Sequence, residues 1–151
     1  MVLISEVMTS QVSEARRAFG SGRMTSQRAI IVAAAGEMGG AFTVDDLAMA
    51  ARGRDAAIGV ATVYRAVSAL EGTGWLERVG ERGGCALFAR CSAGDHHHHH
   101  LICTTCGRIE PSDCPLPAIV ANSATASGFV VTGHEVTLYG LCPECVSARQ
   151  R

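Results

Sequence analysis

The first part of the chain places its apolar residues with the period of α-helices. Residues 6–19 predict one helix, and residues 25–38 predict a second, which has an apolar stripe and ends at a pair of glycines. Thr43 then stands as an N-cap before a third helical stretch, which carries two acidic residues in its first turn and ends near Gly53. The sequence therefore predicts a helical bundle at this end of the chain.

Residues 58–74 predict a fourth helix with two different faces. Apolar residues at helical spacing form the face that we expect to be buried, namely Val60, Val63, Val67 and Leu70. Tyr64 and Arg65 face outward among small residues, where they could enter a DNA major groove, because Arg pairs with guanine or phosphate and Tyr can press on a thymine methyl. On spacing alone, we favour an ordinary exposed edge of an amphipathic helix, because exposed Tyr and Arg are common. The hairpin and the metal-binding region that follow favour DNA contact instead.

The helices are followed by a predicted hairpin. Its strands cover residues 75–79 and 85–90, with a turn around Gly83 and Gly84. Helices followed by such a hairpin are the pattern of a winged helix-turn-helix.

The C-terminal part is rich in predicted strands. We expect strands at 96–103, 107–111, 129–132 and 135–141, and a weak helix at 118–127. The predicted fold class is α+β, with an N-terminal winged helix-turn-helix domain at 1–90, a polar hinge at 91–95, and a small α/β domain at 96–151. Two C-x-x-C pairs tie the turns of the second domain.

Composition and charge narrow the class of protein. Of the 151 residues, 48% are hydrophobic, the formal net charge is −1, and every positive side chain is Arg. Any nucleic-acid contact must therefore be local. No apolar run approaches the roughly 20 residues that span a bilayer, and no signal peptide is recognisable, so we expect a cytoplasmic protein without membrane contact.

The seven cysteines favour metal binding over disulfides in that compartment. Two C-x-x-C turns, Cys103 with Cys106 and Cys142 with Cys145, suit a closed tetrahedral zinc site of structural type. A thioredoxin-like redox site would need one such pair in a βαβ context, which is missing. Because the second domain has few large apolar residues, we expect the metal to stabilise it strongly.

Five consecutive histidines precede the first cysteine pair. An expression tag normally sits at a terminus, whereas this run leads directly into Leu101 and Ile102. On a strand, alternation sends His96, His98 and His100 to one face and His97 and His99 to the other. One strand could therefore supply two different metal sites.

Nearly the whole chain from Met24 resembles the ferric uptake regulator family of metal-dependent repressors. The resemblance rests on five motifs in order: MTSQR, IGVATVYR, HHHHHLICTTCG, GFVVTGHEVTLYG and CPEC. It implies a winged-helix DNA-binding domain, a C-terminal dimerisation domain, structural zinc on the four cysteines, and regulatory metal at the hinge.

Within the family, the chain is most similar to the zinc-sensing branch, because Cys91 stands where zinc sensors carry a cysteine ligand. The resemblance implies a regulatory hinge site of Glu77, Cys91, His98 and His100. A thiolate with two imidazoles and a carboxylate suits tetrahedral Zn²⁺ better than the N/O sets of Fe²⁺ or Mn²⁺.

The family's additional metal site would use His97, His99 and His134. Its usual glutamate falls near residues 116–117 of this chain, which hold no carboxylate. Asp113, Cys114 or Glu110 could replace it, and the sequence does not choose among them. Cys114, like Cys85, otherwise reads as a packing or surface thiol.

For DNA, the resemblance points to Tyr64, Arg65 and Arg23, with Arg28 in a structural role; an A·T-rich minor groove would attract Arg23. The function it implies is a homodimeric zinc-responsive repressor of zinc-uptake genes, which binds operator DNA and no small-molecule substrate. A regulator that senses iron, manganese, nickel or peroxide is the alternative within the family. A zinc store or chaperone is the alternative of another class, and a zinc hydrolase is disfavoured because no HExxH-type or deaminase-type motif is present.

Overall fold

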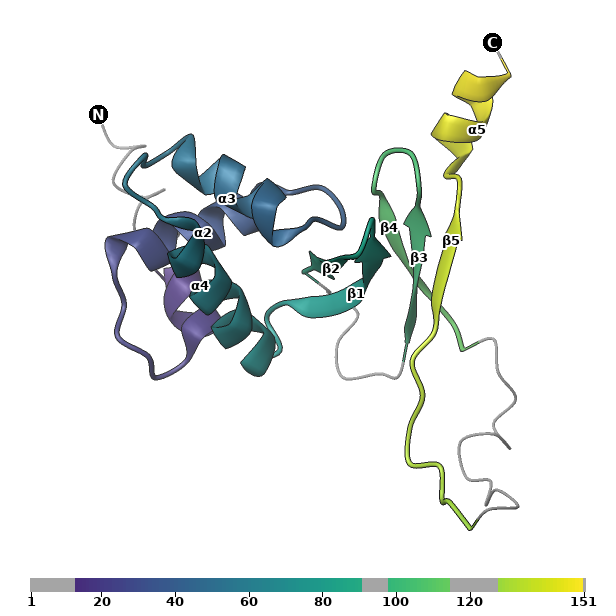
Figure 1. Cartoon of the computed structure of the whole chain (residues 1–151), viewed down its shortest axis with the longest axis horizontal. Coiled ribbons are helices and arrows are strands. Elements are labelled where there is room, and N and C mark those ends of the chain that lie inside the picture. Colours follow the sequence, from purple (N-terminus) through teal and green to yellow (C-terminus); the bar gives the residue numbers. More distant parts are fainter. Residues whose placement is uncertain (1–12, 91–97, 115–127, 151) are drawn as a thin grey trace. The chain divides into compact units, whose positions relative to one another are not determined.

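The computed structural model describes residues 13–90, 98–114 and 128–150. The chain divides into two compact units, Met1–Ser92 and Ala93–Arg151. The first unit places its helices before a two-stranded hairpin, and the second places a three-stranded sheet before a final helix (Figure 1). The predicted hinge at 91–95 lies outside the described residues.

The helices of the first unit lie where their sequence pattern predicts them. They are α2 (Ser26–Glu37), α3 (Val44–Arg52) and α4 (Val60–Gly72), and residues 13–19 are helical as well. Only the second half of the helix predicted at 6–19 falls within the described residues. No described helix has the length and apolar character needed to cross a membrane.

The start of α3 shows why this segment is helical. The Asp46 N–H donates to Thr43 Oγ1 at 3.1 Å, and the Thr43 N–H donates to Asp46 Oδ2 at 2.9 Å. This reciprocal capping box satisfies backbone donors that the first helical turn would leave open. The hydrogen bond from the Thr43 backbone is the largest influence on the Asp46 carboxyl, and together with Arg82 it lowers the pKa of that group. The predicted N-cap is confirmed.

The core of the first unit lies between the three helices and the hairpin. Val63, Val67 and Leu70 of α4 are buried against it as predicted, whereas Val60 is only partly buried. The largest fully buried side chains of this unit are Ile31, Leu47, Ile58, Leu70, Leu76, Leu87, Val32, Val63 and Val79.

The hairpin consists of β1 (Glu77–Arg82) and β2 (Cys85–Ala89), which pair antiparallel. The prediction that its first strand begins at residue 75 was wrong. The N–H of Trp75 donates to the Leu70 carbonyl at 2.9 Å, and Gly74 adopts φ +73°, so these residues still belong to the end of α4. This is the hydrogen-bond pattern of a helix C-terminal Schellman motif, which delays the strand.

In the second unit, β3 (His99–Cys103) lies between β4 (Ile109–Ser112) and β5 (Thr137–Gly140). β4 pairs antiparallel and β5 parallel with this central strand. The predicted strand at 96–103 is thus shorter, because His98 lies outside β3, and residues 96 and 97 are not described. The strand predicted at 107–111 corresponds to β4, which begins later, at Ile109, and ends at Ser112.

The strand predicted at 129–132 was wrong, whereas the strand predicted at 135–141 is present in a shorter form, as β5. Residues 129–132 form no strand beyond a single bridge at Val130. Phe129 is 73% exposed, so this segment has no sheet face to bury. The helix predicted at 118–127 lies outside the described residues.

The last helix, α5 (Pro143–Arg149), was not predicted from the sequence. Cys142 is its N-cap in extended conformation, and Pro143 occupies its first turn. Glu144 near the start and Arg149 near the end complement the helix dipole. These helix signals are local, and they overlap the second C-x-x-C pair, because Cys142 is the N-cap and Cys145 lies within the helix.

Candidate metal centres and nucleic-acid interface

The two C-x-x-C pairs meet at one end of the three-stranded sheet. Cys103 closes β3 and Cys106 follows in the turn, while Cys142 caps α5 and Cys145 lies in its first turns. Parallel pairing places Cys103 opposite Gly140, and the Thr104 N–H donates to the Gly140 carbonyl at 2.9 Å. The four sulfur atoms lie within 4.8 Å of one another.

The spacing of these sulfurs fits a zinc ion. Zn–S bonds of about 2.3 Å in a tetrahedron separate the sulfurs by about 3.8 Å. Sγ of Cys106 and Sγ of Cys142 are 3.7 Å apart, and these cysteines are thiols rather than disulfides. The cluster can therefore hold a tetrahedral ion with little rearrangement.

The thiols of this cluster differ in acidity. Backbone hydrogen bonds from Cys106 and Cys142 lower the pKa of Cys103 to about 6, and the Cys142 N–H lies 3.4 Å from its sulfur. Hydrogen bonding with the Cys142 side chain, followed by burial, raises the pKa of Cys145 to about 12. For Cys106, the backbone of Arg108 acts to lower the pKa, but contacts with the neighbouring thiols and burial outweigh it and raise the pKa. Before a metal binds, Cys103 therefore ionises more readily than Cys106 and Cys145.

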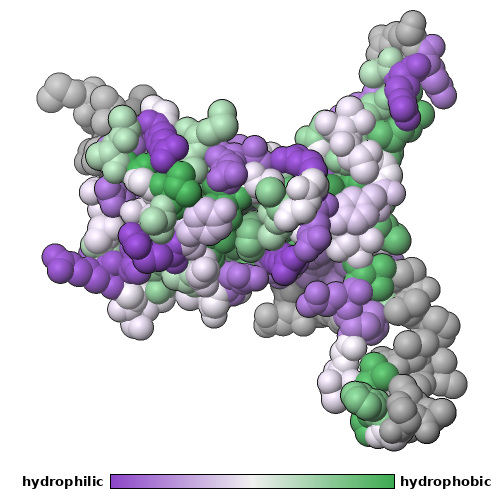
Figure 2. Space-filling view, viewed as in Figure 1, coloured by the Kyte–Doolittle hydropathy of each residue, from purple (hydrophilic) through white to green (hydrophobic). Residues whose placement is uncertain are grey.

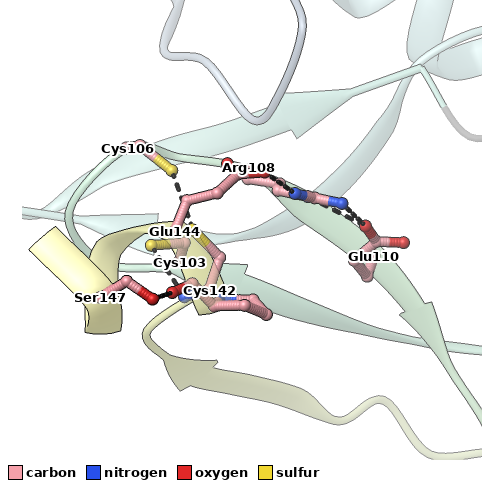
Figure 3. Close-up of polar contacts among 8 residues, drawn as sticks. Cys103, Cys106, Arg108, Glu110, Cys142, Glu144 and Ser147 are labelled. Carbon is pink, nitrogen blue, oxygen red and sulfur yellow. Dashed lines mark hydrogen bonds and ion pairs between the residues drawn. The ribbon is translucent and has the colours of Figure 1, made fainter.

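An arginine links the elements around the cysteines. Arg108 pairs with Glu110 of β4 at 2.9 Å and with Glu144 of α5 at 3.0 Å, as Figure 3 shows. Both carboxylates raise the pKa of the arginine, Glu110 most strongly. Ser147 adds a bond from its hydroxyl to the Pro143 carbonyl at 2.9 Å within α5. These contacts orient the short helix that carries half of the cysteine cluster.

A second cluster lies at the opposite end of the same sheet. His99 begins β3, Cys114 follows the end of β4, and His134 precedes the start of β5. Nε2 of His134 lies 3.2 Å from Nε2 of His99 and 3.0 Å from Sγ of Cys114. His99 is 2% exposed, which is unusual for an imidazole. Two residues of the predicted additional site are therefore brought together, whereas His97 is outside the described residues.

The residues of the predicted hinge site belong to different units. Glu77 begins β1 in the first unit. His98 and His100 belong to the second unit, where their ring centroids are 5.0 Å apart. Cys91 lies outside the described residues, so the hinge set remains a prediction.

The predicted DNA-contacting side chains are exposed on the first unit. Tyr64 is 52% exposed on α4, and Arg65 beside it is also exposed, with its guanidinium 3.3 Å from Thr62 Oγ1. Arg23 is exposed just before α2. Arg28 donates to the Arg23 carbonyl at 2.8 Å and lies over the Phe19 ring at 4.6 Å, which agrees with a structural role.

The sequence left Asp113, Cys114 and Glu110 as candidates for the missing carboxylate position, and the structure brings Cys114 to His134. Glu110 instead pairs with Arg108, and Asp113 is absent from the metal-binding clusters of the described residues. The parallel pairing of β3 and β5 carries no local signal, because β3 ends at Cys103 and β5 begins only at Thr137, so the two strands are far apart in the sequence. The nearest sequence signal was the lack of a carboxylate near residue 116.

Comparison with known proteins agrees with this architecture. The sequence pattern of the "Ferric uptake regulator family" matches residues 20–139. A zinc uptake regulation protein of Mycobacterium tuberculosis (strain CDC 1551 / Oshkosh) is 34% identical over 126 residues, which cover 83% of this chain and 95% of the relative. A ferric uptake regulation protein of Bordetella parapertussis is 38% identical over 109 residues, covering 72% and 77% respectively.

A solved structure supports the fold independently. It is a zinc uptake regulator complexed with zinc and DNA, which covers 100% of both chains with a TM-score of 0.72 and 23% sequence identity. The predicted fold class, a winged helix-turn-helix followed by a small α/β domain, is confirmed by this likeness.

Proposed function

The chain belongs to the ferric uptake regulator family, and we propose that it is a zinc-responsive transcriptional repressor. As a member of this family it is a transcription regulator and not an enzyme. In the proposal, Zn²⁺ is the co-repressor that locks a cytoplasmic homodimer onto A·T-rich palindromic operators of zinc-uptake genes. The 34% identity to a zinc uptake regulation protein over most of both chains is the observation that carries the choice of zinc.

The donor atoms support two kinds of zinc site. Cys103, Cys106, Cys142 and Cys145 hold structural zinc in the proposal, because all four positions of a tetrahedron are then filled by thiolates and none is left for chemistry. The 3.7 Å between Cys106 and Cys142 sulfurs supports this set. Zinc bound there would supply the cross-link between the β3–β4 turn and α5.

We further propose that Glu77, Cys91, His98 and His100 bind the regulatory zinc. Because Glu77 belongs to the first unit and the histidines to the second, these ligands would fix one unit relative to the other when they share an ion. Fixed units would hold both recognition helices of a dimer at the spacing of successive major grooves, about 34–36 Å. Linkage then requires operator DNA to tighten zinc binding by the same factor by which zinc tightens DNA binding.

DNA binding would use the exposed face of α4. Tyr64 and Arg65 are the proposed readers of base edges or phosphates, and Arg23 the proposed contact in the minor groove or to phosphate. The N-cap of α4 is Gly59, which makes no side-chain capping bond. The backbone N–H groups at this helix start favour a nearby phosphate.

An apolar face on the second unit supports a homodimer. Leu101 of β3 and Leu138 of β5 are paired in register, so their side chains share one face of the sheet, and they are 43% and 38% exposed. Figure 2 shows apolar residues, in green, at the surface of the chain. Large exposed apolar side chains next to one another favour burial against a partner, here a second copy of the chain.

Two alternatives predict different behaviour. A regulator sensing iron, manganese, nickel or peroxide would bind the same class of operator in response to another signal, and ferric uptake regulation proteins are also among the relatives. A zinc store or chaperone would bind metal without binding an operator. The proposal therefore requires both metal selectivity and DNA binding.

Fluorescence anisotropy of the reduced protein on an A·T-rich palindromic operator library tests all three functions. The free Zn²⁺ concentration is buffered, and Fe²⁺ is titrated anaerobically in parallel. Tight DNA binding at low free zinc, with no response to iron, is the expected result. Activation by iron at lower occupancy than zinc would identify an iron regulator, and metal binding without DNA binding would identify a zinc store.

Single variants test the proposed roles. We expect Cys91→Ser to lose zinc-dependent DNA binding while it keeps the structural zinc; unchanged zinc dependence would contradict the hinge site. Tyr64→Ala and Arg65→Ala should each weaken operator binding by about 1–3 kcal/mol. Arg149→Ala is the matched control, because it removes one exposed arginine of α5, outside the proposed DNA-binding unit.

A further inference from the structure

The hairpin of the first unit is anchored to the start of α3 at two separate points. Near its base, the Phe42 N–H donates to the Phe88 carbonyl at 2.9 Å, and the Phe88 N–H donates to the Phe42 carbonyl at 2.8 Å. At its tip, the guanidinium of Arg82 pairs with Oδ2 of Asp46 at 2.8 Å. Two anchors along one hairpin fix its direction as well as its position.

A β-bulge between the two anchors leaves the tip dependent on the second one. In β1 the register shifts between Arg78 and Gly80, so Val79 is the extra residue. Such a bulge interrupts the ladder of hydrogen bonds and bends the strand. Residues 81–85, beyond the bulge, are all exposed, so burial does not hold them in place. The ion pair of Arg82 is therefore well placed to fix this part of the hairpin.

The cations of the hairpin are paired with acids of the same unit. Arg78 pairs with Glu81 in its own strand, which is a local contact. Arg82 instead reaches across 36 positions to Asp46, whose carboxylate also accepts the Thr43 N–H at 2.9 Å. Arg82 therefore connects the tip of the hairpin to the capped start of a helix, which Arg78 does not.

The tip lies across a groove from the exposed side of α4. The groove is lined by Gly84 and Cys85 of the hairpin and by Tyr64 and Ser68 of α4. Tyr64 is one of the side chains proposed to contact DNA, so a duplex that reaches it comes close to the tip. The position of the tip therefore determines how well the hairpin and the duplex fit together.

We propose that Arg82 is a positioning residue for operator binding. Its ion pair with Asp46 holds the tip of the hairpin against α3, so that the hairpin and the helices meet the DNA as one body. Arg82 acts through Asp46 and makes no phosphate contact of its own. The anchor stands on the fold of the first unit alone, whereas its effect on DNA affinity rests on the proposed use of α4.

Two substitutions with opposite effects on charge test this role. Arg82→Gln removes a positive charge and Asp46→Asn a negative one, and the Asn oxygen can still accept the Thr43 N–H. Attraction to phosphate alone would weaken operator binding in the first variant and strengthen it in the second. The positioning role predicts weaker binding in both. An exposed ion pair changes an equilibrium constant by up to about fivefold, so a dimer that loses two pairs should bind about tenfold more weakly.

The matched control is Arg78→Gln, which removes the same charge from the same strand but breaks only a local pair. Its effect on operator affinity should be much smaller. Arg82→Lys keeps the charge that pairs with Asp46 and should retain most of the affinity. The double variant Arg82→Gln/Asp46→Asn should bind no more weakly than either single variant, because all three lose the same contact.

The salt dependence of binding separates positioning from a phosphate contact. In Arg82→Gln, the slope of log affinity against log salt concentration should stay at the value of the unaltered protein. A slope that falls by about one unit or more would identify Arg82 as a phosphate contact and overturn the proposal. Unchanged or stronger binding by Asp46→Asn would overturn it as well.

Amide relaxation in the full chain tests the anchor without DNA. The order parameters of the Gly83 and Gly84 amides should fall in Arg82→Gln and in Asp46→Asn, and should not fall in Arg78→Gln. Amides of α2 to α4 should stay ordered, because the paired side chains of residues 82 and 46 are 52% and 40% exposed. Unchanged order at both glycines would overturn the anchor. A loosened tip in a chain that binds no operator would confirm the anchor and refute the proposed function.

Discussion

The backbone N–H of Cys142 lies 3.4 Å from Sγ of Cys103 and donates to it, although 39 residues separate the two positions. This bond joins the first cysteine turn to the start of α5, and it helps to lower the pKa of the Cys103 thiol. This hydrogen bond and the cluster of four sulfurs connect the elements of a unit that has no large apolar core. Among the described residues of the second unit, only His99, Ile102, Cys103 and Gly107 are buried.

Removal of the metal should therefore unfold the second unit first. Structural zinc sites in small domains contribute about 10–16 kcal/mol of binding free energy at neutral pH, and little else stabilises this unit. We expect a strong chelator, or Cys142→Ser, to abolish hydrogen-exchange protection in β3 and β5 while α2 to α4 stay protected. Cys85→Ser is the control that removes a thiol outside the cluster. Equal loss of protection in both units would contradict this view.

Zinc binding to the four cysteines should strengthen as the pH rises. The raised pKa values of Cys106 and Cys145, the latter about 12, mean that zinc must displace at least two protons at neutral pH. Zinc affinity should thus rise by at least about 100-fold per pH unit near pH 7. The dependence should become steeper below about pH 6, where the Cys103 thiolate, whose pKa is about 6, also takes up a proton.

Competition with a chromophoric chelator across this pH range measures the dependence. The Cys91→Ser/Cys114→Ser protein isolates the four-cysteine site from the two other candidate thiolate ligands. A slope close to zero would show that the thiols are already ionised before the metal binds.

Loss of the α3 cap should destabilise the first unit. Thr43→Ala removes the hydroxyl that accepts the Asp46 N–H, and comparable caps contribute about 1 kcal/mol. Urea unfolding followed by a probe of the first unit should show a lower midpoint with an unchanged slope. Thr43→Ser keeps the hydroxyl and should restore most of the free energy of unfolding. If Thr43→Ser were as unstable as Thr43→Ala, the capping bond would not be the cause.

The contribution of Asp46 to this cap should depend on acidity. Its pKa is lowered in the folded state, first by the backbone hydrogen bond from Thr43. The ionised carboxylate therefore stabilises the fold above its unfolded pKa, and this contribution is lost as the pH falls through the lower folded value. Asp46→Asn should remove that acid dependence, as measured by urea unfolding between about pH 2 and 6.

Arg23 and Arg28 should affect DNA binding in different ways. If Arg23 contacts a phosphate, Arg23→Ala should reduce the salt dependence of operator affinity by about one unit of slope. Arg28 is occupied by the Arg23 carbonyl and the Phe19 ring, so Arg28→Lys should weaken binding by displacing Arg23. A double variant should then show less than additive losses. Fully additive losses would indicate that Arg28 contacts DNA by itself.

The sequence by itself determined the features that depend on neighbouring residues. Helical periodicity located α2 and α4, and the Thr43 cap located α3, because each of these signals acts within a few residues of backbone. The C-x-x-C spacing likewise indicated which four cysteines share a site. The two cysteines of each pair are only three positions apart, so a local turn is enough to bring their sulfurs near one another.

Only the tertiary structure decided which distant side chains meet. The parallel pairing of β3 with β5 brings His134 to His99 at one end of the sheet and Cys142 to Cys103 at the other. The antiparallel strand β4 delivers Cys114 to the same end as the histidines, where the sequence offered Asp113 and Glu110 equally. Strand order and register are long-range properties, set by which faces can be buried together, so no local pattern of residues specifies them.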